Sequence, residues 1–146
     1  MKIIIHCSAS NFGNSSLITK WHVVERGWKD IGYHFVILNG QIGANKSYKE
    51  FDGHIETGRP IDDDKWFEPD EIGAHTLGNN NCVGICLIGN SNTFTKKQFD
   101  SLNKLLKMLK KQFGSIEVFQ HSDFDPINKP WCAGITKDKM DELKKV

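Results

Sequence analysis

The sequence has no long hydrophobic run, and this excludes a transmembrane helix as its organising element. A membrane span needs about 20 predominantly apolar residues, which no segment approaches. At the N-terminus three isoleucines, Ile3 to Ile5, precede His6, and that run is too short for the apolar region of a signal peptide. We therefore expect a protein that is made in the cytoplasm and does not associate with a membrane.

An excess of charge of one sign is also missing. Lys and Arg number 19 against 18 Asp and Glu, which gives a formal net charge of +1. A nucleic-acid-binding domain usually carries a strongly basic balance or stripe. Six lysines crowd the segment 96–111, but we interpret them as the solvated side of a helix. We expect no nucleic-acid partner.

The four cysteines do not form a disulfide framework. In a cytoplasmic protein such residues are usually free thiols or metal ligands. Cys82 and Cys86 would lie on one face of a strand at a separation of roughly 13 Å, too far apart to share a metal or a disulfide. We interpret this pair as small buried hydrophobic side chains.

Compact metal motifs such as Cys-x-x-Cys or His-Glu-x-x-His are absent as well. The candidate ligands are instead far apart: His6 follows an apolar run, whereas His121 and Cys132 flank a loop that also carries Lys129. Zinc accepts imidazole and thiolate ligands, and a catalytic zinc site uses three protein ligands. From residue types alone, the simpler interpretation is that these are three unrelated polar residues at strand ends, which do not share a metal.

The hydrophobic pattern predicts a single α/β domain over residues 1–146, with a mixed sheet flanked by helices. At 146 residues and 38% hydrophobic content the chain can fill one core. No linker, repeat or second module is visible. Strands are expected at 2–5, 33–38, 53–57, 82–88 and around 116–118, and helices at about 14–28, at 95–113 and from 136 onward.

Three local expectations are specific enough to test. The first helix should bury a stripe formed by Leu17, Ile18, Trp21, Val24 and Trp28. The dipeptide Asn39-Gly40 should close the strand 33–38 with a hairpin-type turn, after which residues 41–74 become irregular. Alternation along that strand should place Tyr33, Phe35 and Ile37 on one face and His34, Val36 and Leu38 on the other.

Five short motifs occur in an order that resembles a known family. They are His6-Cys7-Ser8-Ala9-Ser10, the stretch from Gly27 to Phe35, Gly73-Ala74-His75, the stretch from Val83 to Gly89, and His121 with Lys129 and Cys132. Together they span nearly the whole chain. They resemble the zinc-dependent N-acetylmuramoyl-L-alanine amidases of the phage-lysozyme type, which belong to the superfamily of type 2 amidases and peptidoglycan recognition proteins.

The resemblance implies one zinc ion per chain, held by His6, His121 and Cys132. It further implies that Tyr33 and Lys129 are the catalytic side chains. His34 and His75 are placed by it near the cleft, where we expect them to contact substrate. One departure is that Lys129 stands three residues before Cys132, whereas the phage lysozymes usually have this lysine two residues before the cysteine.

The implied reaction is hydrolysis of the amide bond between N-acetylmuramic acid and L-alanine in peptidoglycan. Such an enzyme would be a phage or prophage endolysin, made in the host bacterial cytoplasm and acting on the cell wall after membrane permeabilisation. We expect a monomer without a separate cell-wall-binding module. Compared with the family, residues 42–51 and 60–69 are additional, and Trp66 and Phe67 either contact substrate or pack a loop onto the core.

Two other functions remain open. Relatives with this fold that bind muropeptides without cleaving them generally lack the cysteine ligand, so Cys132 favours an enzyme. A phage amidase of this type can also regulate a polymerase, which leaves a regulatory protein partner possible. A closed structural zinc site would need a fourth ligand, and Cys7 is a poor candidate because it points to the opposite strand face from His6.

Overall fold

The computed structural model describes residues 1–28, 30–61, 71, 82–91 and 93–146. Its strands are β1 (Lys2–Cys7), β2 (Phe35–Gly43), β3 (Lys46–Thr57), β4 (Val83–Leu87) and β5 (Glu117–Gln120). Its α-helices are α1 (Ser15–Lys20), α2 (Lys96–Phe113) and α3 (Lys137–Leu143). Two short turns complete the set: η1 (Trp21–Glu25) is π-helical and η2 (His121–Asp123) is a 3-10 turn.

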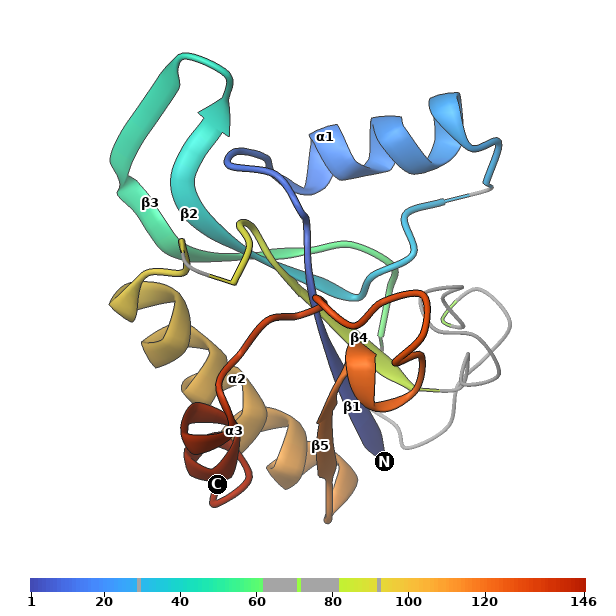
Figure 1. The fold of residues 1–146 in the computed structure, drawn as a ribbon, viewed down its shortest axis with the longest axis vertical. Helices are drawn as coiled ribbons and strands as arrows, with labels where there is room; N and C mark the ends of the chain where they lie inside the picture. The colour runs from blue at the N-terminus through green and yellow to red at the C-terminus, as the bar shows by residue number, and fades with distance from the viewer. Residues whose placement is uncertain (29, 62–70, 72–81, 92) are drawn as a thin grey trace.

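A five-stranded mixed sheet in the order β3-β2-β4-β1-β5 forms the centre of the fold (Figure 1). β1 pairs in parallel with both β4 and β5, and β2 pairs in parallel with β4. Only β3 is antiparallel, because it follows β2 through a tight hairpin. The predicted α/β domain with a mixed sheet is confirmed.

Helices α2 and α3 cover one face of the sheet (Figure 1). Thr95 and Gln98 form a reciprocal capping box at the start of α2, and Gly114, with φ of 85°, ends it as the sequence predicted. The apolar stripe of α2 joins the large core cluster through Leu102, Leu105, Leu106, Leu109 and Phe113. Within the described ranges, no helix is long and apolar enough to cross a membrane.

Helix α1 packs on the smaller cluster, which contains Ile18, Ile31, Val36, Leu38, Cys86 and Ile88. Asn14 caps this helix as expected, since its side chain accepts a hydrogen bond from Leu17 N–H. The predicted stripe is wrong at Val24, which is 70% exposed, whereas Trp28 is half-buried against His22. The chain widens there into η1, in which Arg26 N–H donates to the carbonyl of Trp21. The buried residue of this turn is His22, four residues after the buried Ile18.

The hairpin turn does not lie at Asn39-Gly40, as the sequence predicted. That dipeptide is inside β2, which continues to Gly43 before the chain reverses and β3 begins at Lys46. Gly40 has φ of +87° and marks an irregularity in the β2–β3 register; an added Cβ would lie 2.9 Å from the carbonyl oxygen of Tyr48. Residues 42–51, which are expected from the sequence to be additional to the family, therefore build the end of a long hairpin.

The predicted face of Tyr33 is also wrong. β2 begins only at Phe35, so strand alternation does not extend back to Tyr33. Phe35 and Ile37 share the α2 side of the sheet, as predicted. Tyr33 instead packs against the smaller cluster on the α1 side.

Candidate metal and catalytic site

The first candidate ligand, His6, comes from the C-terminal half of β1. Ile5 and Cys7, its neighbours in the strand, face the large cluster, so alternation turns His6 to the other side of the sheet. The imidazole is almost fully buried, with 1% of its surface exposed. Ligand sites in open α/β sheets lie at the carboxyl ends of parallel strands, which is the end of β1 that carries His6.

The other two candidate ligands lie on the loop that follows β5. His121 begins η2 directly after the strand, and the loop then returns on itself through main-chain hydrogen bonds. Lys129 N–H donates to the carbonyl of Asp125 at 2.8 Å, and Ser122 N–H donates to the carbonyl of Cys132 at 2.6 Å. These bonds close the loop and bring Cys132 back beside His121.

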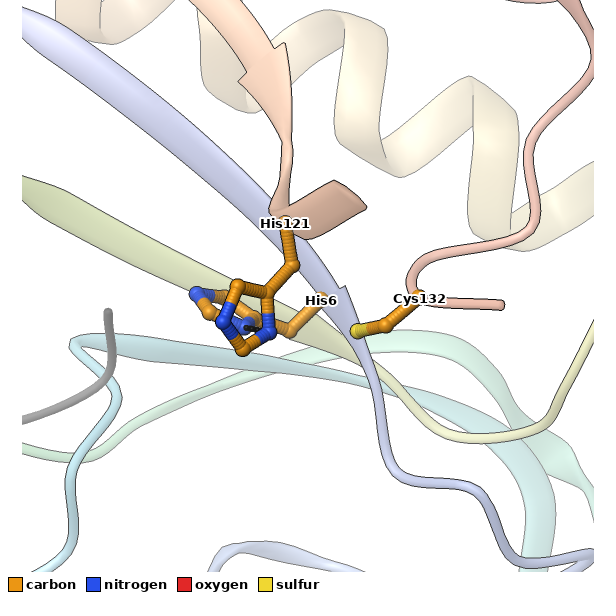
Figure 2. A group of neighbouring side chains, drawn as sticks. All are labelled: His6, His121 and Cys132. Atoms are coloured by element: carbon orange, nitrogen blue, oxygen red, sulfur yellow. Dashed lines mark hydrogen bonds between the residues drawn. The ribbon is translucent and has the colours of Figure 1, made fainter. Parts of the chain in front are cut away.

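His6, His121 and Cys132 converge on one point, as Figure 2 shows. Their ligand atoms all lie within 4.8 Å of one another, and the two Nδ1 atoms are 3.1 Å apart. Ligand bonds of zinc are about 2.0 to 2.3 Å long, so tetrahedral geometry requires separations of roughly 3 to 4 Å between neighbouring ligand atoms. The two imidazoles and the thiol therefore fit a zinc ion with little rearrangement.

The protonation of these groups follows from burial and nearby charge. Burial, and then the positive charge of Lys129, lower the pKa of His121, so the imidazole is neutral and able to bind a metal near pH 7. Contact with the Cys7 thiol, together with burial, raises the pKa of Cys132. The N–H of Cys7 also donates to Cys132 Sγ at 3.3 Å. A bound cation would favour the Cys132 thiolate and release its proton.

The phenol ring of Tyr33 lies beside His6, with 5.0 Å between the ring centroids. Burial raises the pKa of Tyr33 well above its ordinary value. The hydroxyl therefore keeps its proton at neutral pH and can donate a hydrogen bond.

Lys129 lies half-buried on the loop between His121 and Cys132. Its ammonium is 5.1 Å from the ring centroid of Trp131, which is a cation–π distance. Since its charge lowers the pKa of His121, the ammonium is close enough to act electrostatically on the candidate ligands.

Of the two residues expected to contact substrate, the structure describes His34 and not His75. His34 is fully buried; its Nδ1 accepts a hydrogen bond from Gly84 N–H at 2.9 Å, and its Nε2 bonds the carbonyl of Glu71. Burial lowers its pKa to about 4, and the neutral ring ties β2 to β4. Substrate contact by His34 stays a prediction. His75, Trp66 and Phe67 lie outside the described residues.

One buried residue close to the site, His22, was assigned no role from the sequence. It contacts Tyr33 with 5.5 Å between ring centroids. The spacing of four residues from Ile18 to His22 was the available signal, because it places both on one helix face. The sequence also predicts an apolar stripe through Val24, which the structure does not form.

Comparison with known proteins places the chain in a family. The profile of the N-acetylmuramoyl-L-alanine amidase family matches residues 1–135. The endolysin of Klebsiella phage KP32 is 32% identical over 136 residues, which cover 86% of this chain and 76% of the endolysin.

Two solved structures share the fold at TM-scores well above chance. The amidase LysC from Clostridium intestinale is 27% identical with a TM-score of 0.74, and the match covers 99% of this chain and 82% of LysC. A mutant of Drosophila PGRP-LB in complex with tracheal cytotoxin is 26% identical with a TM-score of 0.66, and the match covers 91% and 74% of the two chains. The chain therefore belongs to the N-acetylmuramoyl-L-alanine amidase family and is a peptidoglycan amidase of the endolysin type.

Proposed function

We propose that the amidase reaction of this chain depends on one zinc ion held by His6, His121 and Cys132. The observation that carries the proposal is the convergence of their three ligand atoms within 4.8 Å. Three protein ligands of this kind leave a fourth position open, as in catalytic zinc sites. Zinc bound there supplies a Lewis acid that polarises the scissile carbonyl and activates water.

Tyr33 and Lys129 are the catalytic side chains of the proposal. The amide between N-acetylmuramic acid and L-alanine develops negative charge on its carbonyl oxygen as it is attacked. The protonated hydroxyl of Tyr33, whose ring lies beside His6, and the Lys129 ammonium, whose charge acts on His121, are the available donors, and each can stabilise that charge. Loss of one such donor typically lowers the rate by about a hundredfold to a thousandfold.

The substrate of the proposal is peptidoglycan or a soluble muropeptide. The relation to the phage KP32 endolysin supports wall cleavage, and the PGRP-LB mutant in complex with tracheal cytotoxin supports a cleft of this fold that accepts a soluble ligand. We further propose that His75 contacts the substrate and that the buried His34 contributes to binding indirectly, through its main-chain hydrogen bonds to Gly84 and Glu71. The enzyme would act as a monomeric single domain on the wall, after leaving the host cytoplasm through a permeabilised membrane.

The test measures which bond is cleaved and whether zinc is needed. Purified peptidoglycan is treated with wild-type protein or Cys132→Ser, each untreated, with chelator, and with chelator followed by zinc. Free L-alanine amino termini and reducing sugars are then counted, and bound zinc is measured per chain. Cys82→Ser is the matched control, because it removes a buried thiol outside the candidate site.

We expect wild type and Cys82→Ser to bind one zinc and release amino termini without reducing sugars. Chelator and Cys132→Ser should each abolish that release, and added zinc should restore only the chelated wild type. Stoichiometric zinc binding without cleavage would instead identify a peptidoglycan-binding or regulatory protein. Cleavage that survives the chelator with no zinc bound would refute the metal proposal.

A further inference from the structure

His22 lies in a row of rings that leads to the candidate metal site. Its imidazole is 6% exposed and packs between Trp28, at 4.4 Å between centroids, and Tyr33, at 5.5 Å. Tyr33 in turn lies 5.0 Å from His6. His22 is the buried residue of the π-helical turn η1, and such turns are frequent at functional sites. His22 is therefore linked to the candidate metal site through its contact with Tyr33.

Hydrogen bonds connect His22 to the main chain that carries Tyr33. Gly32 N–H, in the residue before Tyr33, donates to His22 Nδ1 at 2.9 Å. Trp28 N–H donates to the carbonyl of His22, also at 2.9 Å. The two bonds hold both ends of the segment between Trp28 and Gly32.

Tyr33 needs such support because it precedes the regular part of β2. The strand begins at Phe35, so no strand ladder fixes the peptide on the N-terminal side of Tyr33. On the other side, its carbonyl accepts a hydrogen bond from Arg59 N–H at 2.8 Å. The His22 imidazole thus supplies what pairing with a neighbouring strand would otherwise supply.

The ring is in the correct protonation state for this role. Burial, and next the charge of Arg26, lower the pKa of His22 to about 4, so the imidazole is neutral under ordinary conditions. Because Nδ1 accepts from Gly32, the single ring proton resides on Nε2.

We propose that His22 is a positioning residue for the amidase reaction, which holds the Tyr33 hydroxyl toward the site by accepting the Gly32 N–H and by packing against the phenol. The inference rests on the proposed catalytic role of Tyr33. His22 acts only through Tyr33 and touches neither substrate nor metal.

The test compares two substitutions that differ in the acceptor. The amide oxygen of His22→Asn can occupy the place of Nδ1, whereas His22→Leu has similar bulk and no acceptor. With zinc-loaded enzyme and a soluble muropeptide, we expect His22→Leu to lower kcat by between about tenfold and a hundredfold, as a displaced catalytic group does. KM and the zinc bound per chain should stay unchanged, and His22→Asn should recover most of kcat.

A second readout does not depend on activity. The chain has only two tyrosines, Tyr33 and Tyr48, so protein labelled with 3-fluorotyrosine gives two fluorine resonances, which Tyr33→Phe assigns. We expect His22→Leu to shift or broaden the Tyr33 resonance and to leave that of Tyr48 unchanged. Should His22→Leu fail to fold, His22→Gln replaces it, because its amide reaches the place of Nε2 and not that of Nδ1.

Three outcomes separate this inference from the function on which it rests. Wild-type kcat in His22→Leu, or in its replacement His22→Gln, would overturn the positioning role. Equal losses in His22→Leu and His22→Asn, with an unmoved Tyr33 resonance, would do so as well. If Tyr33→Phe keeps full activity, the proposed role of Tyr33 fails and the positioning role fails with it, whatever the fluorine spectra show.

Discussion

The two faces of the sheet are built on different principles. On the α2 side, eighteen buried residues of the described chain form one cluster. Most of them are aliphatic and come from the strands and from helices α2 and α3. The α1 side has a cluster of six, under a six-residue helix and a π-helical turn. Around this smaller cluster lie Tyr33 and the buried histidines His6, His22 and His34.

This difference separates stability from chemistry. Apolar burial is the dominant favourable term in folding, and the α2 side supplies most of it. A buried imidazole contributes less, because it must be desolvated and then satisfied by specific hydrogen bonds. The α1 side bears that cost in order to hold His6 and Tyr33 in fixed positions, while the third candidate ligand, Cys132, is buried in the large cluster. Substitutions on the two sides should therefore have opposite signatures.

The largest effect should follow from removing a candidate metal ligand. We expect His121→Ala to lose stoichiometric zinc and to show no more activity than chelator-treated wild type, because two ligands do not make a catalytic zinc site. Since His121 is only partly buried, the unfolding free energy of the zinc-free protein should change little. Metal analysis, amino-terminus release and urea denaturation in chelator measure the three quantities. Retention of one zinc and of normal activity would contradict the ligand assignment.

The second effect concerns the α2 side. Leu106 is fully buried in the large cluster, and Leu106→Ala should lower the unfolding free energy by about 2 to 5 kcal/mol through lost burial and cavity formation. Activity per folded molecule should stay near that of wild type. Met108→Ala is the control, because Met108 is 53% exposed on the same helix and should change stability by less than about 0.5 kcal/mol. A selective loss of activity in Leu106→Ala would remove the contrast between the faces.

The third effect is a dependence of stability on pH. His34 has a pKa of about 4 in the folded protein, against about 6.5 in an unfolded chain. Between these values the unfolded state binds the proton and the folded state does not, so stability is lost as the pH falls from about 6.5 to 4. The loss should reach about 3 kcal/mol for His34.

Urea denaturation of zinc-free protein at pH 7, 5.5 and 4 measures this loss. His34→Asn has no titrating ring, so its stability should decline less over the same interval. Equal declines in wild type and His34→Asn would show that the buried imidazole is not the cause.

The smallest effect should come from the exposed edge of the site. Trp131 is 48% exposed and lies under the Lys129 ammonium. A cation–π contact at an exposed position contributes about 0.5 to 1 kcal/mol, so Trp131→Leu should reduce kcat by about two- to fivefold. Lys129→Met should lower kcat by more than Trp131→Leu does. Lys137→Met, on an exposed part of α3, should leave kcat unchanged. If Lys129→Met behaves like Lys137→Met, Lys129 is not a catalytic residue despite its place on the loop.

The elements with strong local patterns were predictable from the sequence. Helix α2 has an uninterrupted apolar stripe between a capping threonine and a terminating glycine, and each of these signals acts within a few residues. β1 is a continuous apolar run, as a strand covered on both faces requires. The failures at Val24 and at Asn39-Gly40 arose where a π-helical turn and a strand irregularity altered the period on which the prediction depended.

The sequence by itself determined which residue types were available: two imidazoles, a thiol and a lysine, each beside a predicted strand or loop. Their family could be recognised from the order of short motifs. Only the tertiary structure decided that His6 and His121, 115 residues apart, place their Nδ1 atoms 3.1 Å from each other. The reason is that the site depends on the parallel pairing of β1 with β5 and on the closure of the loop onto Cys132. The spacing from Ile18 could have indicated that His22 is buried, but only the tertiary structure decided that it contacts Tyr33, because the two residues belong to different elements.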